Sequence, residues 1–302
     1  MRQFPLRTLV PAVMALACAS GLRAQDFDPV TKAQGWAHQD RDASFIFLDG
    51  SSRRLITWDR SFGIMGSVSI AALGEQPQMW LPDKYGNIWA IAGTNLTLVG
   101  KDGKIMRREK LPGEVGDLAW DGLNGFVLSY RTAQPYLEMR DYKTAEVLWS
   151  YGTKPGKNAI PTRTLHRVLM RVLSGQNSTV LLAEGGNLGF TAFDGAKGKP
   201  EGQMLFDFNG AVPPALDLGK GDPGPACMWY GKNVAFISTE ADQLPASLGL
   251  GTGQVLARMD LGASFLQLIP TKLGADYRFI GVADKEAVFM APQGGLVFVP
   301  VK

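Results

Sequence analysis

Residues 81–110 read LPDKYGNIWAIAGTNLTLVGKDGKIMRREK, in which apolar, strand-like runs are separated by short turns. The runs are Ile88–Ala92, Leu96–Gly100 and Ile105–Lys110. Gly86-Asn87 and Asp102-Gly103 supply the positive φ angles and the local hydrogen bonds that tight hairpins need. The stretch therefore predicts consecutive antiparallel strands, and it decides the fold because its pattern returns along the chain.

The same pattern of three strand-like runs occurs six times. The units are 44–49/54–58/64–70, 88–92/96–100/105–110, 126–130/136–140/147–151, 180–183/188–193/203–208, 234–238/246–250/255–261 and 277–283/287–291/296–301. The hairpins before the third runs are marked by Asp59, Asp102, Asp141, Asp194, Gly251 and Gln293, at intervals of 43, 39, 53, 57 and 42 residues. These intervals match a four-stranded propeller blade, so we predict an all-β, six-bladed β-propeller of four-stranded antiparallel blades.

A further strand precedes each unit. The candidates are 78–81, 115–119, 168–173, 226–230 and 265–270 for units two to six, and the weakly patterned 34–39 for unit one. We expect residues 25–43 to form an amino-terminal arm and residues 44–302 to form the propeller. Gly152–Leu165 and Asn209–Pro225 are rich in Pro, Gly and Lys and are interpreted as insertions between blades.

The amino terminus is typical of an export signal over residues 1–24. Arg2 and Arg7 flank the start, and the apolar run Leu9–Ala17 is too short to span a bilayer. Cleavage after Ala24 or after Ala19 is expected, and acylation of Cys18 is the alternative, since Leu16-Ala17-Cys18 is a passable lipobox. We predict a periplasmic or secreted protein with no membrane span.

Removing this leader changes the charge balance. The chain has 31 Lys and Arg against 28 Asp and Glu, and the leader holds three Arg and no acid, so 28 of each remain. A formal net charge of zero gives no electrostatic reason to expect nucleic-acid binding. The mature chain released at Ala19 or Ala24 keeps one cysteine, Cys227, which we interpret as a buried structural thiol in an apolar strand.

Two units carry specific motifs. Leu81–Ala90 with Val99–Ile105 resembles the NHL and streptogramin-lyase-like propeller blades, in which an Asp-x-x-Gly-Asn turn feeds an aromatic strand and an Asp-Gly-Lys hairpin follows. Leu48–Asp59 is similar to the NHL pattern in which Asp and Arg bracket the turn. The resemblance implies a six-bladed propeller. It does not carry over lyase activity, because the His and Glu constellation of the streptogramin lyases has no counterpart here.

A gluconolactonase-like propeller is the alternative that this resemblance implies. In that group a divalent cation is bound by carboxylates and an Asn at the axial opening. The residues of this chain that could converge there are Asp117, Glu184, Asn187 and Asp217. The chain has only two histidines, His38 and His166, in no zinc-binding spacing, and it lacks a Gly-x-Ser-x-Gly elbow, so neither zinc nor serine chemistry is indicated.

Propeller geometry predicts where a ligand would bind. The connections between blades and the turns between second and third strands emerge on one face of the ring, which we call the insertion-bearing face. Its polar candidates are Arg131, Arg163, His166, Glu184, Asp217, Asp222, Glu240, Asp242 and Asp284, with Trp229 and Tyr130 as a stacking wall.

Two functional hypotheses follow. The first is an exported, non-catalytic scaffold without a cofactor, whose insertion-bearing face binds a protein, peptide or glycan of the cell envelope. The second is a metal-dependent lactonase or lyase acting at the axial opening. An acylated envelope scaffold is a variant of the first hypothesis if Cys18 carries lipid.

Overall fold

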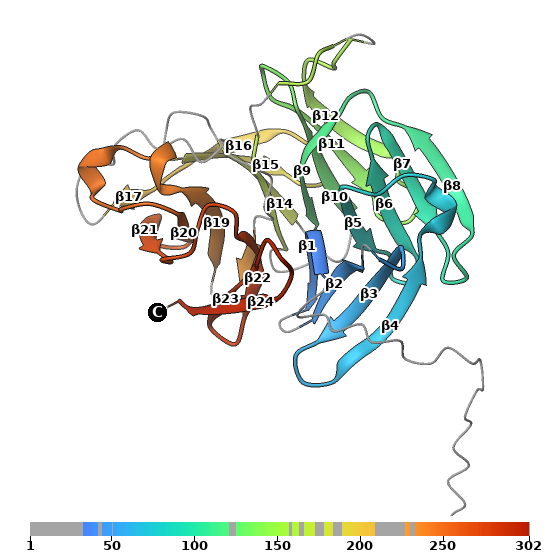
Figure 1. Ribbon diagram of the computed structural model, residues 1–302. Helices are drawn as coiled ribbons and strands as arrows, with labels where there is room; N and C mark the ends of the chain where they lie inside the picture. Colours follow the sequence, from blue (N-terminus) through green and yellow to red (C-terminus); the bar gives the residue numbers. More distant parts are fainter. Residues whose placement is uncertain are drawn as a thin grey trace, which may run out of the picture.

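The computed structural model describes residues 33–41, 44–49, 51–120, 125–156, 159–162, 166–172, 178–183, 189–208, 227–229 and 233–301. The described strands form six sheets around a central axis (Figure 1). Their inner strands meet one another, since β1 contacts β5 and β22, β9 contacts β13, and β18 contacts β13 and β22. The protein is an all-β, six-bladed propeller, as the sequence repeat predicted.

The first four blades are antiparallel and four-stranded, and in each the strands follow in chain order from the innermost to the outermost. Their bounds are β1 (Ala33–Arg41), β2 (Ser44–Asp49), β3 (Arg54–Asp59) and β4 (Gly63–Ser69); β5 (Met79–Pro82), β6 (Ile88–Ala92), β7 (Asn95–Val99) and β8 (Ile105–Lys110); β9 (Val115–Trp120), β10 (Gly125–Tyr130), β11 (Tyr136–Asp141) and β12 (Val147–Gly152); β13 (Val168–Val172), β14 (Ser178–Ala183), β15 (Gly189–Asp194) and β16 (Pro200–Leu205). The strand β1 belongs to the first blade, so the propeller includes residues that we had assigned to an amino-terminal arm.

The last two blades depart from four strands. The fifth contains β18 (Cys227–Trp229), β19 (Val234–Glu240), β20 (Gln254–Asp260) and β21 (Phe265–Pro270), and β17 (Asp207–Phe208) adds to β21 in parallel. The sixth has three described strands, β22 (Arg278–Ala283), β23 (Glu286–Met290) and β24 (Leu296–Pro300).

The strand assignment of the last two units was therefore wrong at two places. Ala246–Leu250, expected as a strand, begins with the 3-10 turn η3 (Ala246–Leu248), and it lies in the long connection between β19 and β20 after η2 (Ala241–Gln243). Positive φ angles at Gly249, Gly251 and Gly253 turn this connection back, so it cannot continue as a strand. Residues 265–270, expected as the innermost strand of the sixth blade, form the outer strand β21 of the fifth.

An aspartate turn recurs between the third and fourth strands of five blades. Its carboxylate accepts hydrogen bonds from backbone N–H groups two or three residues further on, which closes the hairpin. The residues are Asp59, Asp102, Asp141, Asp194 and Asp260. The first four are the hairpin markers found in the sequence, and Asp260 takes the place that we had assigned to Gly251.

Neighbouring blades are joined by buried apolar surface and by side chains that bond to the next blade's backbone. Trp80 Nε1 donates to Ile46 O at 2.8 Å, and Trp149 Nε1 donates to Gly195 O at 2.8 Å. Gln39 of β1 pairs its side-chain amide with the backbone of Val282 in β22, through Nε2 to the carbonyl at 2.6 Å and Oε1 from the N–H at 3.0 Å. This pair of bonds joins the first blade to the sixth.

Strand direction defines the two faces of the ring. Each described innermost strand runs away from the insertion-bearing face, so the turns after first strands and after third strands lie on the opposite face, which we call the hairpin face. Because β22 is an innermost strand, Asp284 in the turn between β22 and β23 lies on the hairpin face. Its carboxylate is 3.4 Å from Arg60 Nη1 in a hairpin-face turn of the first blade. The prediction that Asp284 lies on the insertion-bearing face was wrong, because it took β22 for a second strand.

Within the described part of the chain, no helix is long and apolar enough to cross a membrane. The predicted leader 1–24, with Cys18, lies outside the described residues.

Candidate functional site

The connection 153–167, between β12 and β13, forms the best described part of the insertion-bearing face. Pro155 packs over Gly113 of the preceding inter-blade connection, where an added Cβ would lie 3.2 Å from the proline Cγ. Thr162 N–H donates to Arg131 O at 3.2 Å. Between these anchors Ile160 is 87% exposed, the highest exposure among the large hydrophobic side chains described. The connection therefore presents an apolar side chain to solvent.

Arg131 begins the turn between β10 and β11, directly below this connection. Its Nε is 3.2 Å from Glu114 Oε1, and its backbone N–H donates to Glu114 O at 2.9 Å. The guanidinium thus lies on the insertion-bearing face, and an acid of the neighbouring connection holds it there. Such a partly exposed pair contributes on the order of 1 kcal/mol or less to stability.

His166 is buried, so its imidazole fixes the local structure. Its Nε2 is 2.8 Å from Thr132 O. A carbonyl oxygen only accepts hydrogen bonds, so Nε2 is assigned as the protonated nitrogen. The bond ties the start of the fourth blade to a turn of the third, and it places His166 beneath the insertion-bearing face.

Asp117 lies deeper, on β9, and it joins the inner strands of the third and fourth blades. Its Oδ1 accepts from Leu118 N–H and its Oδ2 from Val168 N–H, both at 3.0 Å. Burial raises the pKa of this carboxyl to about 6, although the charge of Arg167 and the two hydrogen bonds favour the ionised form. Because both oxygens already accept backbone bonds, Asp117 is a joint between blades, and its arrangement gives no support to its predicted role as a cation ligand.

The other cation candidates, Glu184, Asn187 and Asp217, lie outside the described residues. No group of three or more His, Cys, Asp or Glu side chains that could hold a metal occurs among the residues that the structure describes.

Glu240 and Asp242 lie on the insertion-bearing face of the fifth blade. Glu240 is the last residue of β19 and is half-buried, and Asp242 is exposed in η2, where its Oδ1 accepts from Gln243 Nε2 at 3.2 Å. Asp242 is therefore accessible to a ligand. Arg163 and Asp222 lie outside the described residues, as do the side chains of Trp229 and Cys227.

Tyr130 does not form the predicted stacking wall, because it is buried in a polar network at the joint between the second and third blades. Its hydroxyl donates to Glu138 Oε2 at 2.6 Å, and Tyr136 donates to Glu138 Oε1 at 2.9 Å. Burial, followed by the Glu138 carboxylate, raises the pKa of Tyr130 far above its ordinary value. Burial and the same carboxylate raise the pKa of Tyr136 to about 12.

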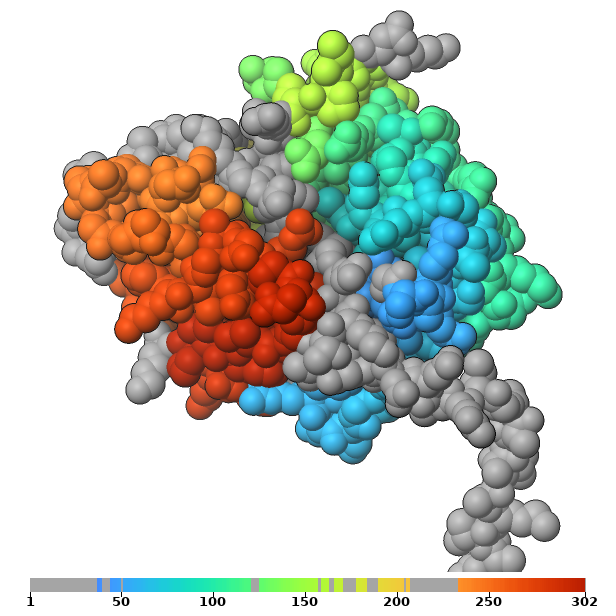
Figure 2. Space-filling model, viewed as in Figure 1, coloured from blue at the N-terminus to red at the C-terminus, as the bar shows by residue number. Residues whose placement is uncertain are grey.

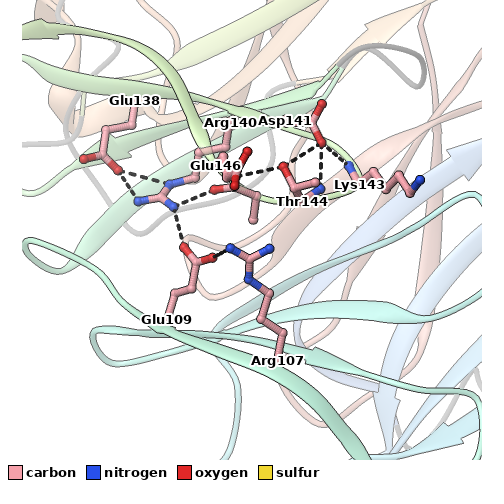
Figure 3. A network of polar contacts seen from close by, with 9 residues as sticks. Arg107, Glu109, Glu138, Arg140, Asp141, Lys143, Thr144 and Glu146 are labelled. Atoms are coloured by element: carbon pink, nitrogen blue, oxygen red, sulfur yellow. Dashed lines mark hydrogen bonds and ion pairs between the residues drawn. The ribbon is translucent and has the colours of Figure 1, made fainter.

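Arg140 completes this network. It donates from Nε and Nη2 to Glu138 Oε2, at 3.1 and 2.5 Å, and from Nη1 to Glu109 Oε2 of β8 at 3.0 Å. Figure 3 shows Glu109 reaching Arg107 on its other side. This network was not predicted from the sequence. The available pattern was Glu138 and Arg140 two residues apart on an otherwise apolar strand, which places opposite charges on one buried face.

The fold defines the class of protein, an all-β, six-bladed β-propeller. No protein-family model matches the chain, and no curated protein matches it in sequence. Virginiamycin B lyase from Staphylococcus aureus is similar in structure, with a TM-score of 0.51, 10% identity, and coverage of 87% of this chain and 78% of that chain.

Two further solved structures are similar. A Bacteroides fragilis protein described as exported has a TM-score of 0.51 and 14% identity, over 92% of this chain and 93% of that chain. Hydrazine synthase from Kuenenia stuttgartiensis has a TM-score of 0.51 and 11% identity, over 89% of this chain and 76% of that chain. At these identities the likeness extends to the fold alone, because one propeller fold hosts many unrelated functions.

Proposed function

We propose that this chain is an exported, non-catalytic scaffold that engages a protein, peptide or glycan of the cell envelope through its insertion-bearing face. The observation that carries this proposal is Ile160, 87% exposed on a connection held at both ends by Pro155 and Thr162. A hydrophobic side chain on an anchored loop loses little conformational entropy on binding, which favours recognition. Arg131 and Asp242 add polar contacts on the same face.

The proposed lack of catalysis is supported by the roles of two of the described titratable candidates. Asp117 and His166 are buried and bonded to backbone groups of a neighbouring strand or turn. An acid–base pair for catalysis needs side chains within hydrogen-bond reach of a substrate. These two residues instead stabilise the joint between the third and fourth blades.

Site-specific photo-crosslinking in the cell envelope tests the binding proposal. The crosslinking amino acid replaces Ala159, which is exposed beside Ile160. A discrete adduct is expected, and Ile160→Asp should remove it. Met106, 61% exposed on the outer strand β8, is the matched control position and should give no such adduct. Equal adducts from both positions, or an adduct unaffected by Ile160→Asp, would contradict the proposal.

Export is part of the same proposal, with residues 1–24 as the leader. The mass of the mature amino terminus tests it. Termini at Gln25 or Ser20 correspond to cleavage after Ala24 or Ala19, whereas an acylated Cys18 corresponds to an envelope-anchored scaffold. A protein that keeps Met1 and stays in the cytoplasm would refute export.

A further inference from the structure

A β-bulge recurs near the start of the fourth strand in each of the first four blades. At this place the pairing register with the third strand skips one residue of the fourth, so that residue has no partner in the ladder. The skipped residues are Met65, Met106, Leu148 and Glu201. All four side chains are exposed. The bulge therefore turns one side chain of each blade outward, on the outer wall of the ring.

In the first three blades, which are neighbours, the bulged residue is large and apolar. Met65 is 60% exposed, Met106 61% and Leu148 51%, and we call these three side chains the bulge row. The residue before each of them is exposed as well, namely Ile64, Ile105 and Val147. Single exposed apolar residues are common in proteins. Here six of the ten exposed large hydrophobic side chains among the described residues lie at one repeated position, which indicates a surface that contacts an apolar environment.

The second blade, in the middle of these three, adds positive charge. Residues 101–110, which we call the basic hairpin, hold five Lys or Arg and two acids, a net charge of +3. The acids are paired, Asp102 with Lys104 at 3.2 Å and Glu109 with Arg107 at 2.5 Å. Three basic side chains are exposed outside these pairs, Lys101, Arg108 and Lys110. Figure 2 shows this part of the chain, in teal, at the right-hand margin of the molecule.

We propose that the outer wall of the first three blades docks on an anionic lipid surface. The bulge row enters the interface between headgroups and hydrocarbon, and the basic hairpin lies over the lipid phosphates. A membrane interface offers phosphate and hydrocarbon close to each other, so both kinds of side chain find partners on one surface. Met106 and Arg108, two residues apart on β8, are placed for this division. This wall is separate from Ile160 and the insertion-bearing face, so the inference goes beyond the proposed function.

The make-up of this wall favours lipid over an acidic glycan and over a protein. A glycan in water would neutralise the basic hairpin but would leave the bulge row exposed to solvent. A specific protein interface has a closely packed apolar core with charged residues at its rim. Here the order is reversed, because the basic hairpin lies on the middle blade and the uncharged outer strands β4 and β12 lie on either side of it. Lipid molecules rearrange around separate side chains, so a bilayer suits this arrangement.

Cosedimentation of the purified mature protein with lipid vesicles tests the proposal. One set of vesicles is phosphatidylcholine alone, and the other has one part phosphatidylglycerol to three parts phosphatidylcholine. Each Lys or Arg near an anionic surface contributes a factor of about five to binding, so three exposed cations predict a partition coefficient about a hundredfold larger for the anionic vesicles. An acyl chain on Cys18 would insert into both sets equally, so the ratio isolates the basic hairpin. Equal partition into the two sets would overturn the proposal.

A double variant tests the basic hairpin. Arg108→Glu with Lys110→Glu should lower partition into the anionic vesicles by at least about thirtyfold, because two attractive charges become repulsive. The matched control is Lys197→Glu with Lys199→Glu, which makes the same change in net charge on exposed residues of the fourth blade. Salt screens charges that lie far from the lipid, so the control should lower partition by less than about threefold. An equal fall in the two double variants would show that only the total charge matters, and the proposal would be wrong.

The variant Met106→Ser tests the bulge row. Partition into the anionic vesicles should fall by about fivefold, because part of an apolar side chain no longer leaves water, while binding to dextran sulfate, a soluble acidic polymer, should not change. Unchanged partition would show that the contact is electrostatic alone and would favour an acidic glycan.

The same experiments separate this inference from the proposed function. Ile160→Asp should leave partition into vesicles unchanged, because Ile160 lies on the insertion-bearing face. Loss of the crosslink at position 159 and loss of vesicle binding are therefore independent results. A protein-sized adduct from the crosslinker at position 106 would identify a protein as the occupant of the outer wall and would overturn the lipid proposal.

Discussion

At the scale of single residues, Asp117 couples stability to pH. Burial raises its pKa from 3.8 to about 6 in the folded protein, so the folded protein holds the proton more tightly than the unfolded chain. Its contribution to stability is fully present below about pH 3.8 and is lost as the pH rises through about 6. The shift corresponds to on the order of 3 kcal/mol.

The variant Asp117→Asn removes this titration. We expect the free energy of unfolding of the variant, relative to wild type, to rise by about 2 kcal/mol between pH 4 and pH 7, as measured by urea denaturation. Asp242→Asn, at an exposed site, is the control and should differ from wild type by a constant amount. A difference for Asp117→Asn that does not change with pH would show that the carboxyl titrates normally.

His38 couples stability to pH with the opposite sign. It lies on β1 beside Trp120, with ring centroids 5.0 Å apart, and burial lowers its pKa from 6.5 to about 3. The unfolded chain therefore binds the proton first, so the stability that the neutral ring contributes is present above pH 6.5 and is lost as the pH falls toward 3.

The variant His38→Phe keeps an aromatic ring that cannot be protonated. We expect wild type to lose about 1.4 kcal/mol per pH unit below pH 6 relative to this variant. Thermal unfolding in buffers from pH 4 to pH 7 measures the difference. The double variant with Asp117→Asn should have the flattest stability profile of the four proteins. Parallel profiles for wild type and His38→Phe would disprove the assignment.

At the scale of elements, the aspartate turn is the repeated local device of this fold. Asp194 accepts from Ala196 N–H at 2.8 Å and from Lys197 N–H at 3.1 Å. We expect Asp194→Ala to lower the free energy of unfolding by about 1–2 kcal/mol, because two turn N–H groups lose a charged acceptor. Asp102→Ala is the matched comparison. Asp102 is more exposed and accepts from one backbone N–H, of Lys104, so its loss should cost less in the same urea titration. Equal losses of unfolding free energy in the two variants would show that the second backbone hydrogen bond of Asp194 does not stabilise its turn.

These turns also show which parts of the fold could be predicted from the sequence. Asp59, Asp102, Asp141 and Asp194 were identified because turn chemistry is local and is written in neighbouring residues. Asp260 was missed because the apolar run Ala246–Leu250 imitates a strand, and this shifted the strand count of the last two blades. Composition alone cannot separate an apolar 3-10 turn from a strand, and here the glycines that follow decide its path.

The candidate site was less predictable than the fold. The placement of Arg131 on the insertion-bearing face followed from strand order alone, whereas its partner Glu114 belongs to a different connection. Asp284 was placed on the wrong face by the same shift in strand count. Ile160 was not selected, because only polar and aromatic residues of this face were considered as ligand contacts, and the exposure of an apolar side chain is known from the structure alone.

At the scale of the whole molecule, the contacts between the sixth and the first blade close the propeller ring. Between the sixth and first blades this joint includes the Gln39 amide, which pairs with both backbone groups of Val282. The same amide lies against Gly281, where a Cβ would collide with Gln39 Oε1. Gly281 also has a φ of 156°, which side chains with a Cβ rarely adopt. The Gln39 side chain thus forms with Val282 the same pair of hydrogen bonds that a backbone residue forms in a β-ladder. These bonds hold β1 and β22 together.

Removal of this amide should loosen the ring at one place. We expect Gln39→Ala to lower the free energy of unfolding by about 1–3 kcal/mol, since the Val282 N–H and C=O lose their partners. Hydrogen exchange in β1 and β22 should accelerate, while β9 and β13, joined through Asp117, keep their rates. Trp149→Phe is the matched control, because it removes one inter-blade bond at a different joint and should accelerate exchange around Gly195 instead. If Gln39→Ala raised exchange evenly in all six blades, the ring would open as one cooperative unit and the joint would have no separate role.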